Sequence, residues 1–175
     1  MSKSLIIYSS TDGHTKTICE RIINFSNDKD VVKIVSLNEV SKFEISEFDK
    51  IVIGASIRYG KHSKELYKFI KLNKNILDRK KNAFFSVNVV ARKSEKNTPE
   101  TNPYIKKFLK ISNWSPKKIG VFAGKVDYPK YDFFDKYIIK LIMFITKGPT
   151  DISQSYEFTD WSKVDIFAKE LWHNS

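Results

Sequence analysis

Cysteine is nearly absent from this chain of 175 residues, and its single cysteine excludes both an intramolecular disulfide framework and a cysteine-cluster metal site. The three histidines stand far apart in the sequence, so we predict no metal centre. Glycine and proline are also few, 6 and 5 residues, and they form no linker that would divide the chain. We therefore predict one domain over residues 1–175, held together by a hydrophobic core instead of cross-links.

Long hydrophobic runs are missing as well. No run approaches the roughly 18 apolar residues that a membrane span needs. The short apolar stretch Leu5–Tyr8 follows the start of the chain directly and has no cleavage site after it, so we expect no signal peptide. The protein is expected in the cytosol, or attached to a membrane from its cytosolic side.

Acidic residues are the remaining deficit. The chain has 31 Lys+Arg against 20 Asp+Glu, a net charge of +11. This excess favours an anionic partner, which could be a nucleic acid, an acidic membrane or an acidic substrate. Composition alone does not choose among the three, although 41% hydrophobic residues exclude an intrinsically disordered chain.

What the sequence does contain is an alternation of short apolar runs with helical patterns. Such alternation is typical of an α/β fold, with a five-stranded parallel sheet and helices on both of its faces. In these sheets ligands bind beyond the carboxyl ends of the strands, where the strand order reverses. The predicted strands are 4–9, 31–37, 50–55, 83–90 and 119–124, and the predicted helices are 14–26, 62–72, 103–111 and 162–172.

The loop after the first predicted strand has the composition of a phosphate cradle. Its hydroxyl groups and the first backbone N–H groups of the following helix are donors, and Gly13 allows a tight turn. The loop lacks lysine and arginine, and neither the Walker A pattern nor Gly-x-Gly-x-x-Gly is present, which argues against ATP and dinucleotides. The alternative is an ordinary helix N-cap. The candidate phosphate ligands are Ser10, Thr11, Asp12, Gly13, His14 and Thr15.

Residues 8–15 resemble the FMN phosphate loop of flavodoxin-like proteins, with Ser10 in a position where threonine is usual. Further segments are similar to the quinone-dependent protoporphyrinogen IX dehydrogenases of bacterial haem biosynthesis, and the likeness extends from about residue 4 to residue 172. It implies a flavodoxin-like fold and an FMN enzyme that oxidises protoporphyrinogen IX to protoporphyrin IX in three two-electron steps. Each hydride would pass to flavin N5, and a membrane quinone, menaquinone or ubiquinone, would reoxidise the flavin. The similar segments are 51–60, 85–93, 98–102 and 137–143.

The resemblance also implies roles for two later loops. The loops after the third and fourth predicted strands would flank the flavin ring and place cations beside it, where they could bind anionic groups of the cofactor or substrate. For the cations, solvated surface turns are the alternative. No catalytic side chain is assigned, because the cofactor carries the chemistry. The candidate ring contacts are Tyr59, Ser86, Val87 and Asn88, and the candidate substrate contacts are Arg58, Arg92 and Lys93.

The stretch from about 125 to 150, after the fifth predicted strand, is long for a connection. Within it, residues 131–147 have apolar side chains at helical spacing, which predicts a helical insert. Lys136, Lys140 and Lys147 form a separate stripe of this helix. A basic helix with a wide apolar face can lie in a membrane interface, with its lysines on anionic head groups. Two alternatives are that it packs on the core or lines the pocket of a large apolar substrate.

Two rival functions remain. A flavodoxin-type electron carrier has no substrate of its own, and such carriers are usually acidic. A non-catalytic basic domain could use runs such as 79–81 and 106–107, but no nucleic-acid motif accompanies them, so no nucleic-acid partner is predicted. We expect FMN, protoporphyrinogen IX, a quinone and an anionic membrane surface as partners, at the cytoplasmic side of a bacterial inner membrane. His62 and His173 are predicted at the surface, and Cys19 inside the first helix.

Overall fold

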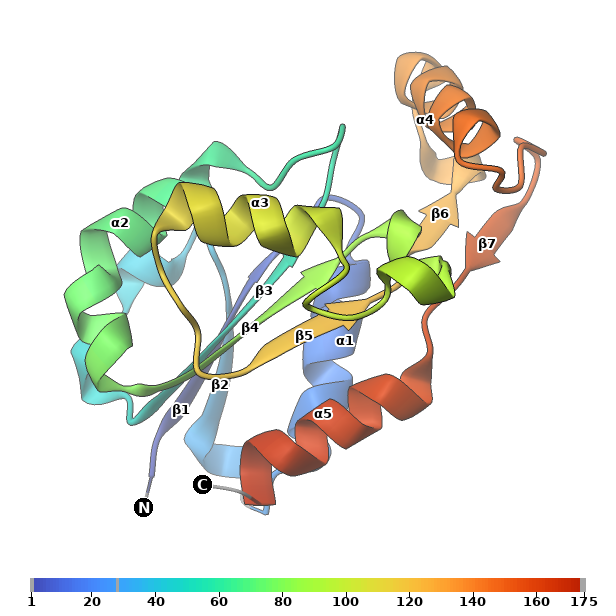
Figure 1. Cartoon of the computed structure of the whole chain (residues 1–175). Coiled ribbons are helices and arrows are strands. Elements are labelled where there is room, and N and C mark those ends of the chain that lie inside the picture. Colours follow the sequence, from blue (N-terminus) through green and yellow to red (C-terminus); the bar gives the residue numbers. More distant parts are fainter. Residues whose placement is uncertain (1, 28, 174–175) are drawn as a thin grey trace.

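The computed structural model describes residues 2–27 and 29–173 and contains one five-stranded parallel sheet, in the order β2-β1-β3-β4-β5 (Figure 1). The chain steps from β1 to β2 on one side and then to β3 on the other, so the strand order reverses at the carboxyl ends of β1 and β3. This arrangement confirms the predicted fold class and marks where ligands bind in such sheets. The strands are β1 (Ser4–Ser9), β2 (Val32–Ser36), β3 (Lys50–Ser56), β4 (Lys81–Val87) and β5 (Ile119–Phe122).

Two helices cover each face of the sheet. On one face lie α1 (His14–Ile23) and α5 (Trp161–His173), and on the other lie α2 (Lys64–Arg79) and α3 (Pro103–Ser112) (Figure 1). Because both faces are covered, β1 and β3 are buried on either side, which explains their uninterrupted apolar sequences. Each face has its own hydrophobic cluster, one with α2 and α3 and one with α1 and α5.

Side-chain caps fix the starts of α2 and α3. Ser63 accepts a hydrogen bond from the backbone N–H of Leu66, at 3.2 Å. The side chain of Asn102 accepts from the backbone of Tyr104, at 3.1 Å, and Pro103 occupies the first position of α3. Both arrangements satisfy backbone donors that a helix leaves without partners, so these two starts follow from the local sequence.

Several predicted boundaries differ from the structure. α2 continues to Arg79 instead of 72, because Leu77 extends its buried stripe by two turns. α1 ends at residue 23 instead of 26. β4 ends at Val87 instead of 90, since the Asn88 side chain caps a 3-10 segment that follows. The 3-10 segments are Lys29–Val31, Val40–Lys42, Ile45–Glu47, Val89–Arg92, Ser94–Lys96 and Tyr128–Lys130.

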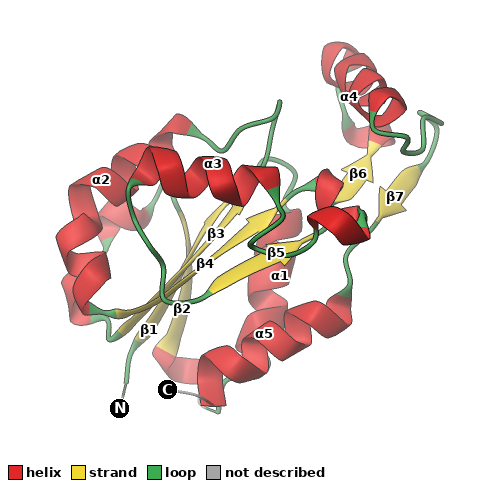
Figure 2. Cartoon of the chain, in the orientation of Figure 1, coloured by secondary structure: helices red, strands yellow, loops and turns green. Residues whose placement is uncertain are grey.

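The insert after β5 is a strand–helix–strand unit, which is more than the predicted helix. β6 (Lys125–Asp127) pairs antiparallel with β7 (Ser155–Glu157), and the chain that connects these two strands forms α4 (Phe133–Ile145) (Figure 2). The insert therefore reaches residue 157 instead of about 150. Three-residue strands have no recognisable period, so the sequence did not reveal this pair. The two strands hold α4 beyond the carboxyl ends of the main sheet (Figure 1).

α4 has 13 residues, about 20 Å of helix at 1.5 Å per residue, and is shorter than the predicted 131–147. It begins after Asp132, whose side chain accepts from the backbone N–H of Asp135 at 2.8 Å. Within residues 2–27 and 29–173, neither α4 nor another helix is long and apolar enough to cross a membrane.

Candidate functional site

The first turn of α1 has the features of an anion-binding site. Gly13, at the N-cap position, has φ +85°, a left-handed conformation that glycine adopts easily, and it donates its backbone N–H to Ser10 Oγ at 2.9 Å. No side chain caps the helix in the described structure, and its first turn has no acidic residue. The positive end of the α1 dipole is therefore left for a ligand at the carboxyl end of β1.

Thr15 supplies a buried donor to the same loop. Its Oγ1 is buried and has no hydrogen-bond partner among the described residues, an arrangement that costs about 1–3 kcal/mol for a buried polar group. The hydroxyl belongs to a pocket of about 410 Å³ at the strand-order reversal. A phosphate oxygen could accept a hydrogen bond from this hydroxyl, so the loop fits the phosphate of FMN. The pocket is lined by Ser10, Thr11, Asp12, His14, Thr15, Ser56, Ile57, Arg58, Val87, Asn88, Val89, Gly124 and Lys125.

His14 joins this loop to the base of the insert. Its Nε2 lies 2.6 Å from Thr159 Oγ1, and that hydroxyl donates to the carbonyl of Ala123 at 2.8 Å. Because the hydroxyl has one proton, His14 Nε2 is the donor of the first bond. Burial lowers the pKa of His14, while Glu157 raises it and Lys125 lowers it further. A neutral ring with Nε2 protonated thus lines the phosphate pocket.

A second and more apolar cleft opens beside the phosphate pocket. It encloses about 620 Å³ of space, part of which is open to solvent, and shares Asp12, Ile57 and Arg58 with the first pocket. Its roof is the inner side of α4. The lining residues are Asp12, Ile57, Arg58, Tyr59, Gly60, Val89, Val90, Arg92, Tyr104, Lys125, Val126, Tyr131, Ile139, Ile142, Met143 and Thr146.

Arg58 connects the phosphate loop to the insert. Its guanidinium pairs with Asp12 at 3.0 Å and with Asp135, in the first turn of α4. It also lies over the rings of Tyr59 and Tyr131, 5.3 and 5.2 Å from their centroids. Arg58 is therefore not a solvated loop residue, and it fixes one end of α4 over the cleft.

Arg92 holds the other end of α4. Its Nη2 donates to the carbonyl oxygen of Thr146 at 2.7 Å and its Nη1 to that of Val89 at 3.0 Å. Burial lowers the pKa of its guanidinium. Arg92 lines the cleft, but its donors are already bonded to the carbonyls of Val89 and of Thr146, the residue that follows α4. Lys93 is half-buried and is not among the residues that line the cleft or the phosphate pocket.

Ser86 and Asn88 belong to an internal polar network beneath the site. Ser86 is fully buried; its Oγ accepts from Asn88 Nδ2 at 3.2 Å and lies 3.0 Å from His62 Nε2. Asn88 Oδ1 in turn accepts from Asn102 Nδ2, at 3.1 Å. Asn88 and Val87 line the phosphate pocket, whereas the Ser86 hydroxyl does not reach it.

His62 is not a surface residue, so that prediction is wrong. It is 3% exposed and packs among Tyr67, Phe84 and Phe108, and burial lowers its pKa to about 4. Its position at the start of an amphipathic helix suggested solvent. The partner that buries its polar edge, Ser86, comes from a strand more than twenty residues away, a pairing with no local sequence signal.

Three tyrosines line the cleft. Tyr59 was expected there, and it occupies a left-handed turn with Gly60, at φ +49° and +72°. Tyr104 and Tyr131 were not expected, although Tyr131 lies in the aromatic-rich turn before α4. Burial raises the pKa of both phenols, so they are neutral donors in a largely apolar cleft.

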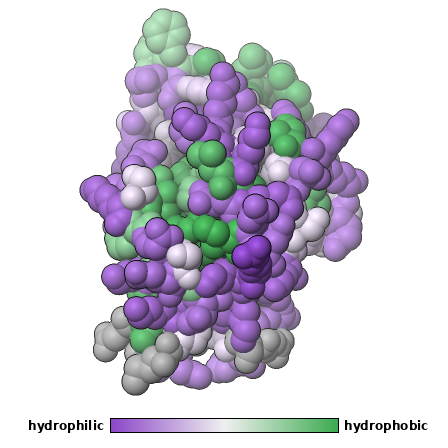
Figure 3. Space-filling view, turned by 90° about the vertical axis from the view of Figure 1, so that its left-hand side faces the viewer, coloured by the Kyte–Doolittle hydropathy of each residue, from purple (hydrophilic) through white to green (hydrophobic). Residues whose placement is uncertain are grey.

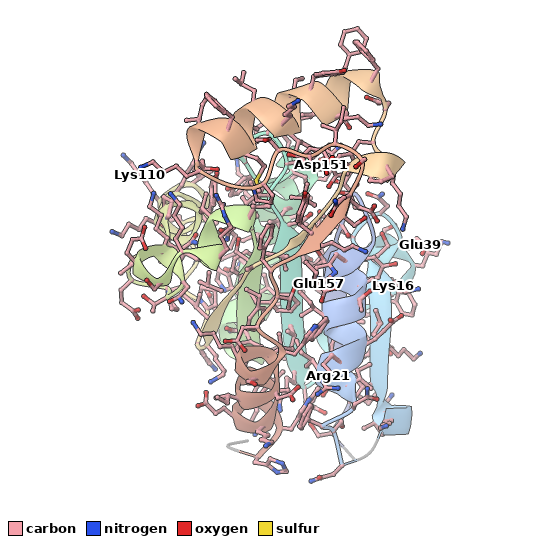
Figure 4. All side chains as sticks on the ribbon, turned by 90° about the vertical axis from the view of Figure 1, so that its right-hand side faces the viewer. Lys16, Arg21, Glu39, Lys110, Asp151 and Glu157 are labelled. Atoms are coloured by element: carbon pink, nitrogen blue, oxygen red, sulfur yellow. The ribbon has the colours of Figure 1, made fainter. Side chains whose placement is uncertain are left out.

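The outer side of α4 remains exposed. Met143 is buried, whereas Phe134 is 76% and Phe144 72% exposed. Figure 4 shows α4 lying across the end of the molecule, and in Figure 3 hydrophobic side chains protrude at the top of the view. α4 therefore does not bury its main apolar face on the sheet. The exposed apolar residues are Phe133, Phe134, Tyr137, Ile138, Leu141, Ile142, Phe144 and Ile145.

The three lysines of the predicted stripe do not share the outer face of α4. Lys136 and Lys140 are half-buried and precede Met143 by seven and three positions, so they flank the inner side of the helix. Lys147 lies beyond the end of α4, with φ +57°, and is exposed. The predicted lysine stripe thus borders the side that faces the protein.

The fold and the phosphate loop define a flavodoxin-domain protein, and the model of the flavodoxin domain family matches residues 5–153. The chain is 43% identical over 171 residues to a protoporphyrinogen IX dehydrogenase (quinone) of Leishmania major, covering 97% of this chain and 74% of that protein. It is 38% identical over 172 residues to the enzyme of that name in Escherichia coli K12, covering 98% of this chain and 95% of that protein. The chain belongs to the family of quinone-dependent protoporphyrinogen IX dehydrogenases, as its resemblance suggested.

Among solved structures, the chain resembles a flavoprotein in complex with FMN from Lactobacillus acidophilus. The TM-score is 0.48 and the sequence identity 17%, over 69% of this chain and 93% of that one.

Proposed function

We propose that the protein oxidises protoporphyrinogen IX to protoporphyrin IX, with FMN as its cofactor and a quinone as the electron acceptor. The family membership supports this reaction. The observation that carries it in the structure is the apolar cleft beneath α4, which opens directly beside the phosphate pocket. An electron carrier needs only the phosphate pocket, since it has no substrate to hold in a cleft.

The phosphate loop is the proposed anchor of the cofactor. The hydroxyl of Thr15 and the first N–H groups of α1 would donate to the phosphate, together with Ser10 and Thr11. The Asp12 carboxylate would repel that phosphate, but Arg58 pairs with it and offsets its charge. The flavin ring would lie toward Tyr59, Val87 and Asn88, with Ser86 supporting the last from behind. When bound, FMN supplies a hydride acceptor at N5 that a quinone can reoxidise.

The lining of the cleft suits an apolar tetrapyrrole. Ile139 and Met143 roof it, and Val126 and Val90 contribute to its walls. Arg58, Arg92 and Lys125 add positive charge at its edge, which suits the two propionates of the substrate. Lys93 stands outside the lining, so we assign it no direct contact.

The exposed face of α4 is the proposed membrane contact. The quinone acceptor is dissolved in lipid, and burying a Phe or Leu side chain contributes about 1.5–3 kcal/mol. Several such side chains on one helix can hold a peripheral protein in the interface. Lys136 and Lys140 border the side of α4 that faces the protein and Lys147 lies beyond its end, so the apolar side chains would make the main contact of this helix. We propose a peripheral protein on the cytoplasmic side of a bacterial inner membrane.

An anaerobic assay tests the reaction. FMN-loaded protein is mixed with protoporphyrinogen IX in detergent, with and without a quinone, and porphyrin fluorescence is followed. We expect porphyrin to accumulate over many turnovers only when the quinone is present. Porphyrin formation that does not depend on quinone, or none at all, would contradict the proposal, and the second result would favour a carrier.

A matched pair of α4 variants tests the cleft. Ile142 lines it and Ile138 does not, although the two side chains are similarly exposed. Ile142→Gln is expected to raise KM for protoporphyrinogen in detergent several-fold. Ile138→Gln should leave that KM unchanged, and equal effects would place the substrate elsewhere.

A further inference from the structure

The positive charge of the protein is concentrated in one part of the chain. Residues 61–118 contain 16 Lys+Arg and 4 Asp+Glu, a net charge of +12. The rest of the chain has 15 Lys+Arg and 16 Asp+Glu, a net charge of −1. The insert, residues 125–157, has 5 of each and is electrically neutral. The basic excess therefore does not come from the helix with the exposed apolar face.

Part of this charged segment forms one surface. It contains α2 and α3, which pack side by side over the same face of the sheet (Figure 1). Leu66 and Ile70 of α2 and Phe108 of α3 are buried, so the opposite sides of both helices face solvent. The exposed lysines there make up what we call the α2–α3 basic face: Lys64, Lys68, Lys71, Lys106, Lys107 and Lys110.

The lysines of this face are available to a partner. In the described part of the chain, none of the six forms an ion pair, unlike the neighbouring Lys74, which pairs with Asp78 at 2.6 Å. Two large apolar side chains stand among them. Leu72 is 73% exposed one turn after Lys68, and Ile111 is also exposed one turn after Lys107. Cations mixed with isolated apolar side chains suit the boundary between lipid head groups and acyl chains.

The α2–α3 basic face and α4 lie toward the same side of the molecule. In Figure 1, α3 and α4 lie toward the upper side, α2 lies at the left beside α3, and α5 lies below the sheet. Figure 4 places Lys110 of α3 near the level of α4, with Arg21 toward the opposite end. A surface that meets the outer side of α4 can therefore approach the basic face as well.

We propose that the α2–α3 basic face is a second membrane-contact surface, which binds anionic head groups while α4 enters the apolar boundary. This inference rests on the proposed membrane contact of α4. An amphipathic helix enters the boundary by about 5–10 Å, and exposed lysines elsewhere on the protein are attracted to anionic lipid over a Debye length of about 8 Å. An apolar helix combined with a basic patch gives the two signals that stable anchoring requires.

The proposal separates the two forces by region. The neutral insert contributes apolar burial, which does not depend on lipid charge. The α2–α3 basic face contributes attraction that appears only with anionic lipid, about five-fold in affinity for each lysine near the surface. An acidic protein would also be attracted to this face, but it would not need the adjacent apolar side of α4.

Two triple variants with the same loss of charge test this division. One changes Lys68, Lys71 and Lys107 to Gln, and the other changes Lys136, Lys140 and Lys147 to Gln. FMN-loaded protein is sedimented with phosphatidylcholine vesicles, with and without about one third phosphatidylglycerol. The first variant is expected to lose at least ten-fold in affinity for the anionic vesicles and nothing for the neutral ones. The second should lose less than about three-fold.

Each other outcome counts against the proposal. Unchanged anionic binding of the first variant would overturn it and leave the face to an acidic protein. An equal or larger loss in the second variant would return the electrostatic contact to the insert. If the wild type binds neither vesicle, the membrane contact of α4 fails too, while the detergent assay still decides the reaction. Both variants change solvent-accessible lysines, so an unchanged Tm verifies folding.

Discussion

The five-stranded sheet with α1, α2, α3 and α5, which we call the body, differs from the insert in how its helices are buried. The helices of both regions have amphipathic sequences, but they bury their apolar faces to different extents. Ile18 and Ile22 of α1 and Phe108 of α3 are fully buried against the sheet. In α4 only Met143 is comparably buried, and a row of large apolar side chains is left in solvent. A periodic apolar stripe thus shows that a helix has a face to cover, but what covers it depends on the rest of the molecule.

The two regions also differ in how they are held. The body is held by layers packed on both faces of the sheet. The insert has a small cluster around Tyr128 and Met143, and two arginines attach α4 to the loops of the site, Arg58 at its start and Arg92 at its end. The insert should therefore respond to single changes without unfolding the body.

The largest contrast is expected between two phenylalanines. Phe108 stacks on Phe84 with ring centroids 3.8 Å apart, so Phe108→Ala should lower the free energy of unfolding by about 3–5 kcal/mol. Phe144→Ala, on the exposed side of α4, should cost less than about 1 kcal/mol. Urea unfolding measures both. Similar losses at the two positions would mean that α4 packs its outer face within the protein.

The next effect concerns pH and belongs to the body alone. Because burial lowers the pKa of His62 to about 4, the unfolded chain binds its proton at a higher pH than the folded one. The resulting stability is fully present above about pH 6.5 and is lost as the pH falls toward 4, in total about 2–3 kcal/mol.

His62→Gln isolates that contribution. The slope of unfolding free energy against pH, between 4 and 6.5, should become shallower in this variant than in the wild type. The exposed His173→Gln should leave the slope unchanged. A slope that survives in the His62 variant would assign the acid sensitivity to other groups.

A smaller effect is expected at the phosphate loop. Thr15→Val removes the buried hydroxyl without a partner, so FMN affinity should fall about ten- to a hundred-fold, as expected for a hydrogen bond to a charged group. The apoprotein should not lose stability. Thr17→Val is the control, because that hydroxyl, on the same helix, is exposed and 3.5 Å from the Gly13 carbonyl. Fluorescence titration with FMN compares the two, and equal affinities would remove Thr15 from the site.

The sequence predicted the body well because each part of the body follows a local rule. Continuous apolar runs marked the buried strands, and the polar turn from Ser10 to Thr15 marked the end of β1. The family resemblance added the reaction. These features depend on neighbours within a few residues, which a single sequence contains.

Features that depend on distant partners were not predictable in the same way. His62 was predicted at the surface, but in the structure it contacts Ser86 and Phe108, which are distant in sequence, and is buried. The Arg58–Asp135 pair joins positions 77 residues apart. The outward orientation of α4 depends on which of its sides the β6–β7 pair presents to the body, and no period in the sequence contains that information.

The smallest effect is expected at the junction between the two regions. Asp135→Asn removes the ion pair with Arg58, and because Arg58 keeps its pair with Asp12 and the Asn amide oxygen can still accept a hydrogen bond, the change should cost about 1 kcal/mol. Hydrogen exchange should show amides of α4 losing about five-fold in protection, while those of β1 are unchanged. Asp151→Asn, elsewhere on the insert, controls for charge, and a double-mutant cycle with Arg58→Gln isolates the pair. Loss of protection throughout the body would mean that the insert and the body unfold as one unit. That result would contradict the inference that the insert can respond to a single change without the body.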